Sequence, residues 1–399
     1  MRDFLKDSGV LVAAFLTFSV AGCHGGSRQE TASEEQEPIA DAPTQEIIPE
    51  QVAEVIPEQA SAISPENVTV SATSFNPSLK EQVRLGYRLA QADQVTVRVY
   101  DSDGGLVRTL VDAAAREAGT HEESWNGRDD AYRVVPDEAY TFTIETAAGG
   151  VYDPTTVSGG VVDDIRDAQF DWEGGTVAYK LPAPARVLIR LGIRSGPMLK
   201  TLVDWRPRVA GTITEYWDGR DEDKLMSLRE REGFSALITH VTLPDATVIA
   251  YGNDEETYRD YKLGRGQERP QKPERPRQED SELRLRPTGL VPPAWSRAPK
   301  VSMTFPKHTE TVPAARGEIA VRIDVDTSDK GLLLADQFEV IFFVDNVFFA
   351  EAERGHLPFN WPWELQQLPP GEHVLTVNIS SFKGQVGVAS RKMRVVAEE

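Results

Sequence analysis

Two acidic clusters have the residue types that bind calcium. In the first, Asp101, Asp103 and Asp112 stand at the first, third and twelfth positions of an EF-hand spacing. However, Gly105 offers no side-chain ligand at the fifth position, and Leu106 replaces the glycine that the sixth position requires. Because Asp-Gly and Gly-Gly steps also fall in this segment, we favour a tight hairpin turn over a calcium loop.

The second acidic cluster, Asp324, Asp326 and Asp329, ends a predicted strand. These carboxylates could hold Ca²⁺, but alternating polar side chains on the exposed face of a strand explain them more simply. We therefore predict no bound metal and no other cofactor.

Three aromatic residues near the C-terminus, Phe359, Trp361 and Trp363, are the candidate ligand-binding residues. Alternate residues of a strand share a face, so Trp361 and Trp363 could form a platform on which a sugar ring stacks. The alternative, which we favour, is that one or both rings belong to the core, because tryptophan is highly buried on average.

The sequence lacks the motifs of catalysis and of nucleic-acid binding. Its six histidines match neither H-E-x-x-H nor another metal-ligand spacing, and no G-x-S-x-G, P-loop or dinucleotide fingerprint occurs. The formal net charge of -20 opposes phosphate binding, which needs clustered Lys and Arg. The sequence thus predicts a protein that is not an enzyme and has no nucleic-acid partner.

The single cysteine, Cys23, follows an apolar run at 10–20 (VLVAAFLTFSV) that has the length of a signal-peptide core. The residues VAGC at 20–23 resemble the lipobox of bacterial lipoproteins. This resemblance implies cleavage of residues 1–22, acylation of Cys23 and attachment to a membrane, which two or three acyl chains make stable. An ordinary secretory signal with an incidental cysteine is the alternative. Because His24 and not Asp follows the cysteine, we expect a place in the cell envelope at the outer membrane, facing the periplasm or the surface.

Residues 23–70 have the composition of a tether. Between 27 and 67 the sequence has ten acidic residues, one arginine and no aromatic residue. Such a stretch cannot bury enough apolar surface to offset the entropy of ordering, so we predict that it is disordered.

An internal repeat occupies the middle of the chain. VRTLVD at 107–112 recurs as LKTLVD at 199–204, and WNGRD at 125–129 recurs as WDGRD at 217–221. Both pairs are offset by 92 positions (199 − 107 and 217 − 125). A period this long fits a whole small domain, so the repeat predicts two copies of one domain.

Both copies have the pattern of a β-sandwich. Val95, Val97 and Val99 alternate with polar residues, as in a strand with one buried face. Turn signals follow at short intervals, which is typical of sandwiches. We therefore predict one sandwich at 71–160 and a second at 161–262.

Both copies, the first more fully than the second, resemble the FlgD-type immunoglobulin-like (Ig-like) domain, which is widespread in exported bacterial proteins. The family elements F-x-P, D-x-x-G-x-x-V-R-x-L, A-G-x-H, W-D-G-x-D and P-D-G-x-Y are matched, with small departures, at residues 75–77, 101–110, 118–121, 125–129 and 136–140. The second copy lacks F-x-P and has Ile213 where the family often has His. The resemblance implies a fold, and it does not carry over a flagellar role.

The C-terminal part is a different module behind a second linker. Residues 263–299 are charged and proline-rich, which predicts an extended spacer. In residues 300–399, apolar side chains alternate along 319–325, and the stretch 363–377 resembles bacterial Ig-like domains of another type. We expect this distal domain to carry the binding activity.

Together these patterns predict an all-β protein of tandem Ig-like β-sandwiches behind a disordered N-terminal tether. We expect a non-enzymatic scaffold or spacer that is held at the membrane through the lipid on Cys23 and binds a protein or glycan partner through its distal domain. The alternatives are an accessory subunit of an envelope secretion or surface-assembly complex, and a Ca-dependent or carbohydrate-binding adhesin.

Overall fold

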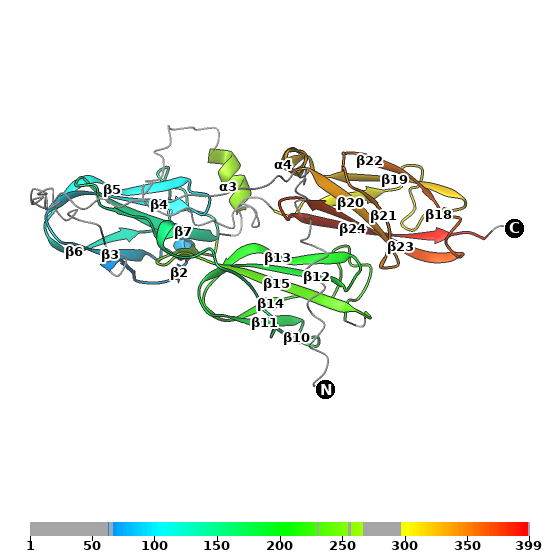
Figure 1. Ribbon diagram of the computed structural model, residues 1–399, viewed down its shortest axis with the longest axis horizontal. Coiled ribbons are helices and arrows are strands. Elements are labelled where there is room, and N and C mark those ends of the chain that lie inside the picture. Colours follow the sequence, from blue (N-terminus) through cyan, green and yellow to red (C-terminus); the bar gives the residue numbers. More distant parts are fainter. Residues whose placement is uncertain (1–62, 64–66, 230, 254–256, 266–296, 398–399) are drawn as a thin grey trace, which may run out of the picture. The chain divides into compact units, whose positions relative to one another are not determined.

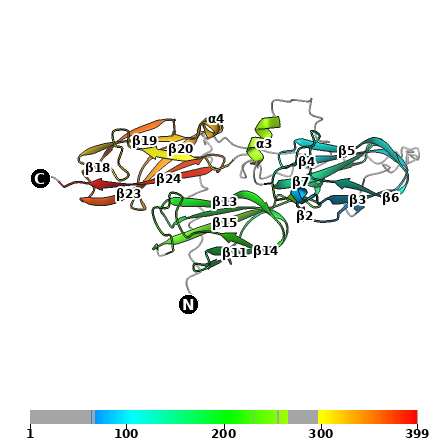
Figure 2. The same ribbon diagram turned by 180° about the vertical axis from the view of Figure 1, so that it is seen from behind.

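The computed structural model describes residues 63, 67–229, 231–253, 257–265 and 297–397. The predicted signal peptide, Cys23, nearly all of the tether and most of the second linker lie outside these ranges. The described chain consists mainly of β-strands in several sheets (Figures 1 and 2), which confirms the all-β prediction. No helix within these ranges is long and apolar enough to cross a membrane.

The first sandwich places a three-stranded sheet against a larger one. The strands of the smaller sheet are β1 (Thr69–Val70), β3 (Val83–Leu89) and β6 (Gly119–Trp125). The larger sheet runs in the order β2 (Ser74–Phe75), β16 (Val248–Ala250), β7 (Glu138–Thr146), β4 (Asp93–Asp101) and β5 (Leu106–Arg116), with β8 (Val151–Tyr152) also paired to β7. Val95, Val97 and Val99 of β4 are fully buried, as their alternation predicts, and the Trp125 ring lies among Phe75, Tyr140 and Phe142.

The second sandwich repeats this plan. Its sheets are β10 (Gln169–Asp171), β11 (Thr176–Leu181) and β14 (Gly211–Tyr216), and β13 (Met198–Arg208), β12 (Ala185–Ile193), β15 (Phe234–Thr242) and β9 (Val162–Asp164). Trp217 occupies the position of Trp125 in its core. A short 3₁₀ turn (Pro77–Leu79) connects β2 to β3 in the first sandwich, and the helix α2 (Pro154–Val157) connects β8 of the first sandwich to β9 of the second.

The offset of 92 positions also holds for irregular features of the backbone and for polar contacts. Ala113 (φ 45°) and Trp205 (φ 49°) take the same left-handed conformation on β5 and β13. Tyr87 donates a hydrogen bond to Glu123 (3.2 Å), which Arg116 also contacts, and their counterparts at 179, 215 and 208 form the same set, with 2.9 Å between phenol and carboxylate. The repeat therefore extends from sequence motifs to individual hydrogen bonds.

After the second sandwich, the chain returns to the first. Residues 248–250 form β16, which lies between β2 and β7 in the larger sheet of the first sandwich. The helix α3 (Tyr258–Arg265) follows, and its side chains contact the β4–β5 turn and Asp129 of the first sandwich. The range predicted for the second copy, 161–262, thus includes a final stretch that packs with the first copy.

The third sandwich is formed by residues 300–397. Its sheets are β17 (Val301–Thr304), β19 (Glu318–Val325) and β22 (Phe359–Glu364), and β18 (Ala314–Ala315), β24 (Val386–Val395), β23 (Gly371–Ser381), β20 (Phe338–Val344) and β21 (Val347–Ala352). Helix α4 (Thr327–Asp336) connects β19 to β20. The β20–β21 turn has positive φ at both Asp345 (51°) and Asn346 (70°), as a tight type I′ hairpin requires.

Candidate functional site

The acidic residues considered for calcium have separate roles in the structure. Asp101 accepts hydrogen bonds from the backbone N–H groups of Asp103 (3.1 Å) and Gly105 (2.7 Å), which closes the β4–β5 turn, while Asp112 is exposed on β5. In the described ranges, no group of three or more His, Cys, Asp or Glu side chains has an arrangement that could hold a metal ion.

The second cluster is also divided among different contacts. Asp324 pairs with Lys330 (2.8 Å), and Asp326 caps the N-terminus of α4 by accepting from the Ser328 N–H (2.9 Å). Asp329 is buried and contacts Arg259 of α3.

The aromatic candidates on β22 point toward the core of the third sandwich. Trp361 and Trp363 share a face and stack at 5.6 Å, as their spacing predicts, but Trp363 is 0% exposed and offers no surface to a sugar. Phe359 and Trp361 are half-buried and pack against Phe342. The structure therefore leaves only parts of Phe359 and Trp361 accessible.

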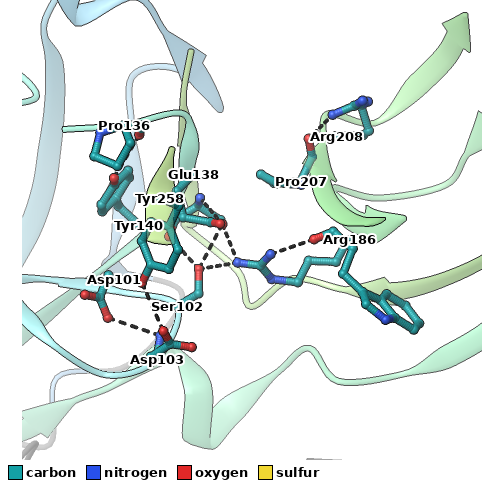
Figure 3. Close-up of polar contacts among 12 residues, drawn as sticks. Asp101, Ser102, Asp103, Pro136, Glu138, Tyr140, Arg186, Pro207, Arg208 and Tyr258 are labelled. Atoms are coloured by element: carbon teal, nitrogen blue, oxygen red, sulfur yellow. Dashed lines mark hydrogen bonds and ion pairs between the residues drawn. The ribbon is translucent and has the colours of Figure 1, made fainter. Parts of the chain in front are cut away.

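A buried cluster of charged and polar side chains joins the first two sandwiches (Figure 3). The Arg186 guanidinium of β12 contacts Glu138 at the start of β7 and Ser102 in the β4–β5 turn, and it donates to the Trp205 carbonyl (2.7 Å). The Arg186 and Glu138 side chains are 9% and 4% exposed. We call Ser102, Glu138 and Arg186, together with Asp101, the polar junction.

Helix α3 adds a second layer of contacts to the polar junction. Lys262 lies 2.7 Å from the fully buried Asp101 carboxylate, and the Tyr258 hydroxyl donates to Asp103 (3.3 Å). A Cβ at Gly105 would lie 2.6 Å from Asp101 Oδ2 and 2.8 Å from Lys262 Nζ, so a larger residue here would require these two side chains to shift. The absence of a side chain at this position thus leaves room for the contact between Lys262 and Asp101.

Burial controls the ionisation of the phenols beside the polar junction. It raises the pKa of Tyr140 well above its usual value, and the neighbouring Glu138 carboxylate acts in the same direction. Burial and then the carboxylates of Asp101 and Asp103 raise the pKa of Tyr258 strongly. Both phenols therefore stay neutral and act as hydrogen-bond donors, as Tyr140 does to the Pro136 carbonyl (2.9 Å).

A contact to the third sandwich starts from α3. Arg259 contacts the Asp329 carboxylate and the Ser328 carbonyl, and the Lys300 N–H donates to the same carboxylate (2.9 Å). Arg297 lies 3.3 Å from Asp329 as well. The buried Asp329 thus contacts two arginines and a backbone amide where the third sandwich begins.

The second and third sandwiches also contact each other directly. The Asn378 side chain on β23 bonds both backbone groups of Met198, accepting from its N–H (2.9 Å) and donating to its C=O (2.8 Å). Arg190 contacts the Gly384 carbonyl, and burial lowers the pKa of this arginine to about 10. Met198, Val386 and Val388 form an apolar cluster beside these bonds.

Sequence reasoning missed the polar junction, although the repeat contains a signal for it. The counterparts of Asp101 and Ser102 in the second copy are Ile193 and Arg194, and the counterpart of Arg186 in the first copy is Gln94. Positions that build the shared fold are alike in the two copies, whereas these positions differ. At these three positions, a residue of the polar junction in one copy therefore has no equivalent in the other.

Comparison with known proteins gives a match to the first sandwich. Residues 75–150 match the family of the FlgD Ig-like domain. The basal-body rod modification proteins FlgD of Salmonella typhimurium and Salmonella typhi are each 39% identical over 66 residues, which is 16% of this chain and 28% of theirs. The chain thus spans about 28% of the length of these curated relatives.

Two solved structures are also similar over parts of the chain. FlgD from P. aeruginosa is 25% identical, covering 23% of this chain and 72% of its own, with a TM-score of 0.18. The endo-β-1,4-mannanase from Thermotoga petrophila is 21% identical, covering 47% of this chain and 30% of its own, with a TM-score of 0.20. The family match and the strand arrangement together identify residues 75–150 as an Ig-like domain of the FlgD type.

Proposed function

We propose that this protein is a non-enzymatic, lipid-anchored scaffold of the bacterial cell envelope that positions a binding domain at a distance from the membrane. The observation that carries this proposal is the pairing of buried charged groups between sandwiches, at Arg186 with Glu138 and at Arg259 with Asp329. Any other contact between the same elements would leave one of these charges buried without its partner, which is costly, so such pairs favour one arrangement of the elements that they join over others. A spacer that presents a partner site in a defined direction needs this property.

The third sandwich is the proposed binding domain. It lies outside the 92-residue repeat, although its two sheets have the same strand order as those of the first sandwich. The residues that the two FlgD-like copies share serve turns and cores. Its half-buried aromatic residues and its exposed Val347 and Phe348 are apolar groups that a protein or glycan partner could cover.

A truncation tests where binding resides. A chain ending at Arg297 retains the anchor and both FlgD-like copies, so we expect export and membrane attachment to persist while recovery of partners from cross-linked membranes is lost. A chain ending at Ala397 is the matched control and should recover partners as the wild type does. Full recovery with the shorter chain would place the binding site in the first two sandwiches or the linkers.

The anchor is tested separately. Cys23→Ala should move the protein from the detergent phase to the aqueous phase, or leave it uncleaved, because no thiol remains to acylate. His24→Ala keeps the cysteine and the residues before it, and it should partition as the wild type does. Retention of Cys23→Ala in the detergent phase after normal processing would contradict the lipid anchor.

A further inference from the structure

The third sandwich has an open side between two edge strands. Among the described residues, β21 pairs only with β20, and β22 pairs only with β19, so each ends its sheet. Phe349 of β21 contacts Trp361 (5.9 Å) and Trp363 (6.1 Å) of β22, which places the two edges on the same side of the sandwich. The half-buried rings of Phe359 and Trp361 lie at this open side.

The two edge strands differ in how well their backbones can pair with another strand. Strand β22 carries the exposed Pro362, which has no N–H to donate to a ladder. Strand β21 contains no proline and no lysine, the residues that commonly protect an edge. Its one irregularity is a register shift between Phe342 and Phe343 of β20, which leaves Phe349 of β21 without an opposite residue. The unpaired backbone of β21 is therefore the edge that is open to pairing.

The side chains of β21 define what a pairing strand would meet. Ala350 and Ala352 lie opposite Phe342 and Val340 and pack on the core, so their small size leaves room for apolar side chains of an added strand beside Trp361. On the other face, Phe348 is 52% exposed and contacts Phe343. Successive positions of an added strand would thus alternate between the open core and this outer face.

Negative charge gathers on the outer face. Glu351 lies opposite Ile341 on the neighbouring strand, and Glu353 follows the end of β21. Burial, and then the carboxylates of Glu351 and Glu353, raise the pKa of Glu339 on β20. No ion pair to these three carboxylates occurs within the described part of the chain, so the field at this edge is available to a cationic partner.

We propose that β21 is a strand-acceptor site for an extended segment of another protein in which apolar and basic side chains alternate. The apolar side chains of this segment lie over Ala350, Ala352 and the exposed part of Trp361, and its Arg or Lys side chains lie beside Glu351 and Glu353. A second copy of this chain is disfavoured, because it would bring a second Glu351 and Glu353 to the same acidic edge. This inference rests on the proposed function in that it gives the distal domain a partner of stated chemistry.

A fluorescent peptide of alternating valine and arginine residues, added to the full chain, tests the proposal by anisotropy. We expect it to bind, and we expect binding to weaken at least tenfold when glutamate replaces arginine in the peptide, or when proline replaces every second residue and removes the pairing N–H groups. Hydrogen exchange should show new protection of β21 amides on binding.

Protein variants locate the site. The double variant Glu351→Lys, Glu353→Lys should bind the valine–arginine peptide at least tenfold more weakly. The double variant Glu318→Lys, Glu364→Lys makes the same charge change on the other sheet and should leave binding unchanged. Both double variants should keep the thermal unfolding midpoint of the wild type, since all four side chains are exposed. Equal weakening by both pairs, no binding of the peptide, or concentration-dependent dimerisation through β21 would overturn the proposal.

The two proposals fail in different ways. If the Arg297 truncation loses its partners but the Glu351→Lys, Glu353→Lys variant recovers them fully, the strand-acceptor site is wrong and the distal domain is still the binding domain. If the peptide binds at β21 but the truncation recovers every partner, the scaffold model with a distal binding domain is wrong.

Discussion

At the scale of single residues, the two tryptophans shared by the two copies of the repeat have equivalent surroundings. The indole N–H of Trp125 donates to the Arg128 carbonyl (3.0 Å), and that of Trp217 donates to the Arg220 carbonyl (2.9 Å). Both rings are nearly inaccessible, at 1% and 6% exposure. Each ring therefore fills the core of its sandwich while its polar atom stabilises the turn that follows.

Replacing either tryptophan should destabilise only its own sandwich. Trp125→Ala and Trp217→Ala each remove a large buried ring and leave a cavity, which costs about 3–5 kcal/mol. Urea unfolding followed by hydrogen exchange of the two copies would locate each loss. Tyr216→Ala, at a side chain that is 81% exposed on the neighbouring position, is the control and should cost little. A loss shared equally by both sandwiches would show that they unfold as one unit.

His373 gives the third sandwich a pH-dependent contribution to stability. Burial alone lowers its pKa, but hydrogen bonds from Nδ1 to the Asp345 carboxylate (2.7 Å) and from Nε2 to the Pro369 carbonyl (2.8 Å) favour the charged ring, and the net pKa is raised. Because the folded pKa lies above the unfolded value, this stabilisation is complete below the unfolded pKa and is lost as pH rises through the folded pKa.

We therefore expect His373→Gln to lower the free energy of unfolding more at pH 5.5 than at pH 9. Asp345→Asn removes the carboxylate and keeps a residue that tolerates positive φ. In that background the difference between the two pH values should largely disappear. A His373→Gln effect that is the same at both pH values would contradict the assignment of the charged ring.

At the scale of elements, strand β16 makes the first sandwich depend on a distant part of the chain. Among the described residues, β2 joins its sheet through β16 alone, with Ile249 donating to Thr73 (2.9 Å) and Tyr251 donating to Phe75 (3.1 Å). Phe75 is 2% exposed and packs 5.4 Å from the Trp125 ring. Loss of β16 would therefore free β2 and open the core beside Trp125.

A fragment of residues 63–160 should consequently be less stable than the first sandwich within 63–265. We expect a lower urea midpoint for the short fragment, and partial recovery when a peptide of residues 244–253 is added. Residues 161–243 contain all strands of the second sandwich and should show no response to that peptide. Equal stability of residues 63–160 with and without the peptide would mean that β16 is not part of the folded unit.

The sequence predicted the strands and turns within each copy of the repeat, but it did not predict the contacts that join the two copies. Alternation at 95–99, the turn glycines and the offset of 92 predicted strands, turns and repeat, because these depend on local spacing. The three residues of β16 carry no sign of which sheet they enter. The pairing of Arg186 with Glu138 spans 48 positions and needs the fold to bring it together. The spacing of Trp361 and Trp363 predicted a shared face, but the opposing sheet determines that this face is the core.

At the scale of the whole molecule, contacts within residues 61–399 connect all three sandwiches. Arg186 links the first two, Arg259 links α3 to the third, and Asn378 links the second to the third. Each sandwich is thus linked to both of the others, directly or through α3, so loss of one contact leaves the other two in place. We therefore expect loss of these contacts to change the distances between the sandwiches more than the free energy of unfolding of any single sandwich.

Spin labels can measure this effect at the polar junction. In a Cys23→Ser background, labels at the exposed positions 115 and 173 report the distance between the first and second sandwiches. Arg186→Met leaves Glu138 buried without its partner, a loss of about 3–5 kcal/mol that separation of the interface would relieve. We therefore expect a broader distance distribution than in the wild type.

The matched control for this measurement is the double variant Arg186→Met, Glu138→Met. An apolar pair of similar volume can replace a buried ion pair without loss of stability, so the double variant should return to a narrow distribution. This result would show that the charge left without a partner, and not the lost volume, loosens the interface. If Arg186→Met leaves the distance distribution as narrow as in the wild type, the polar junction does not hold the first two sandwiches together. The contacts of both sandwiches with the third, such as those around Met198, would then fix the orientation of the first two.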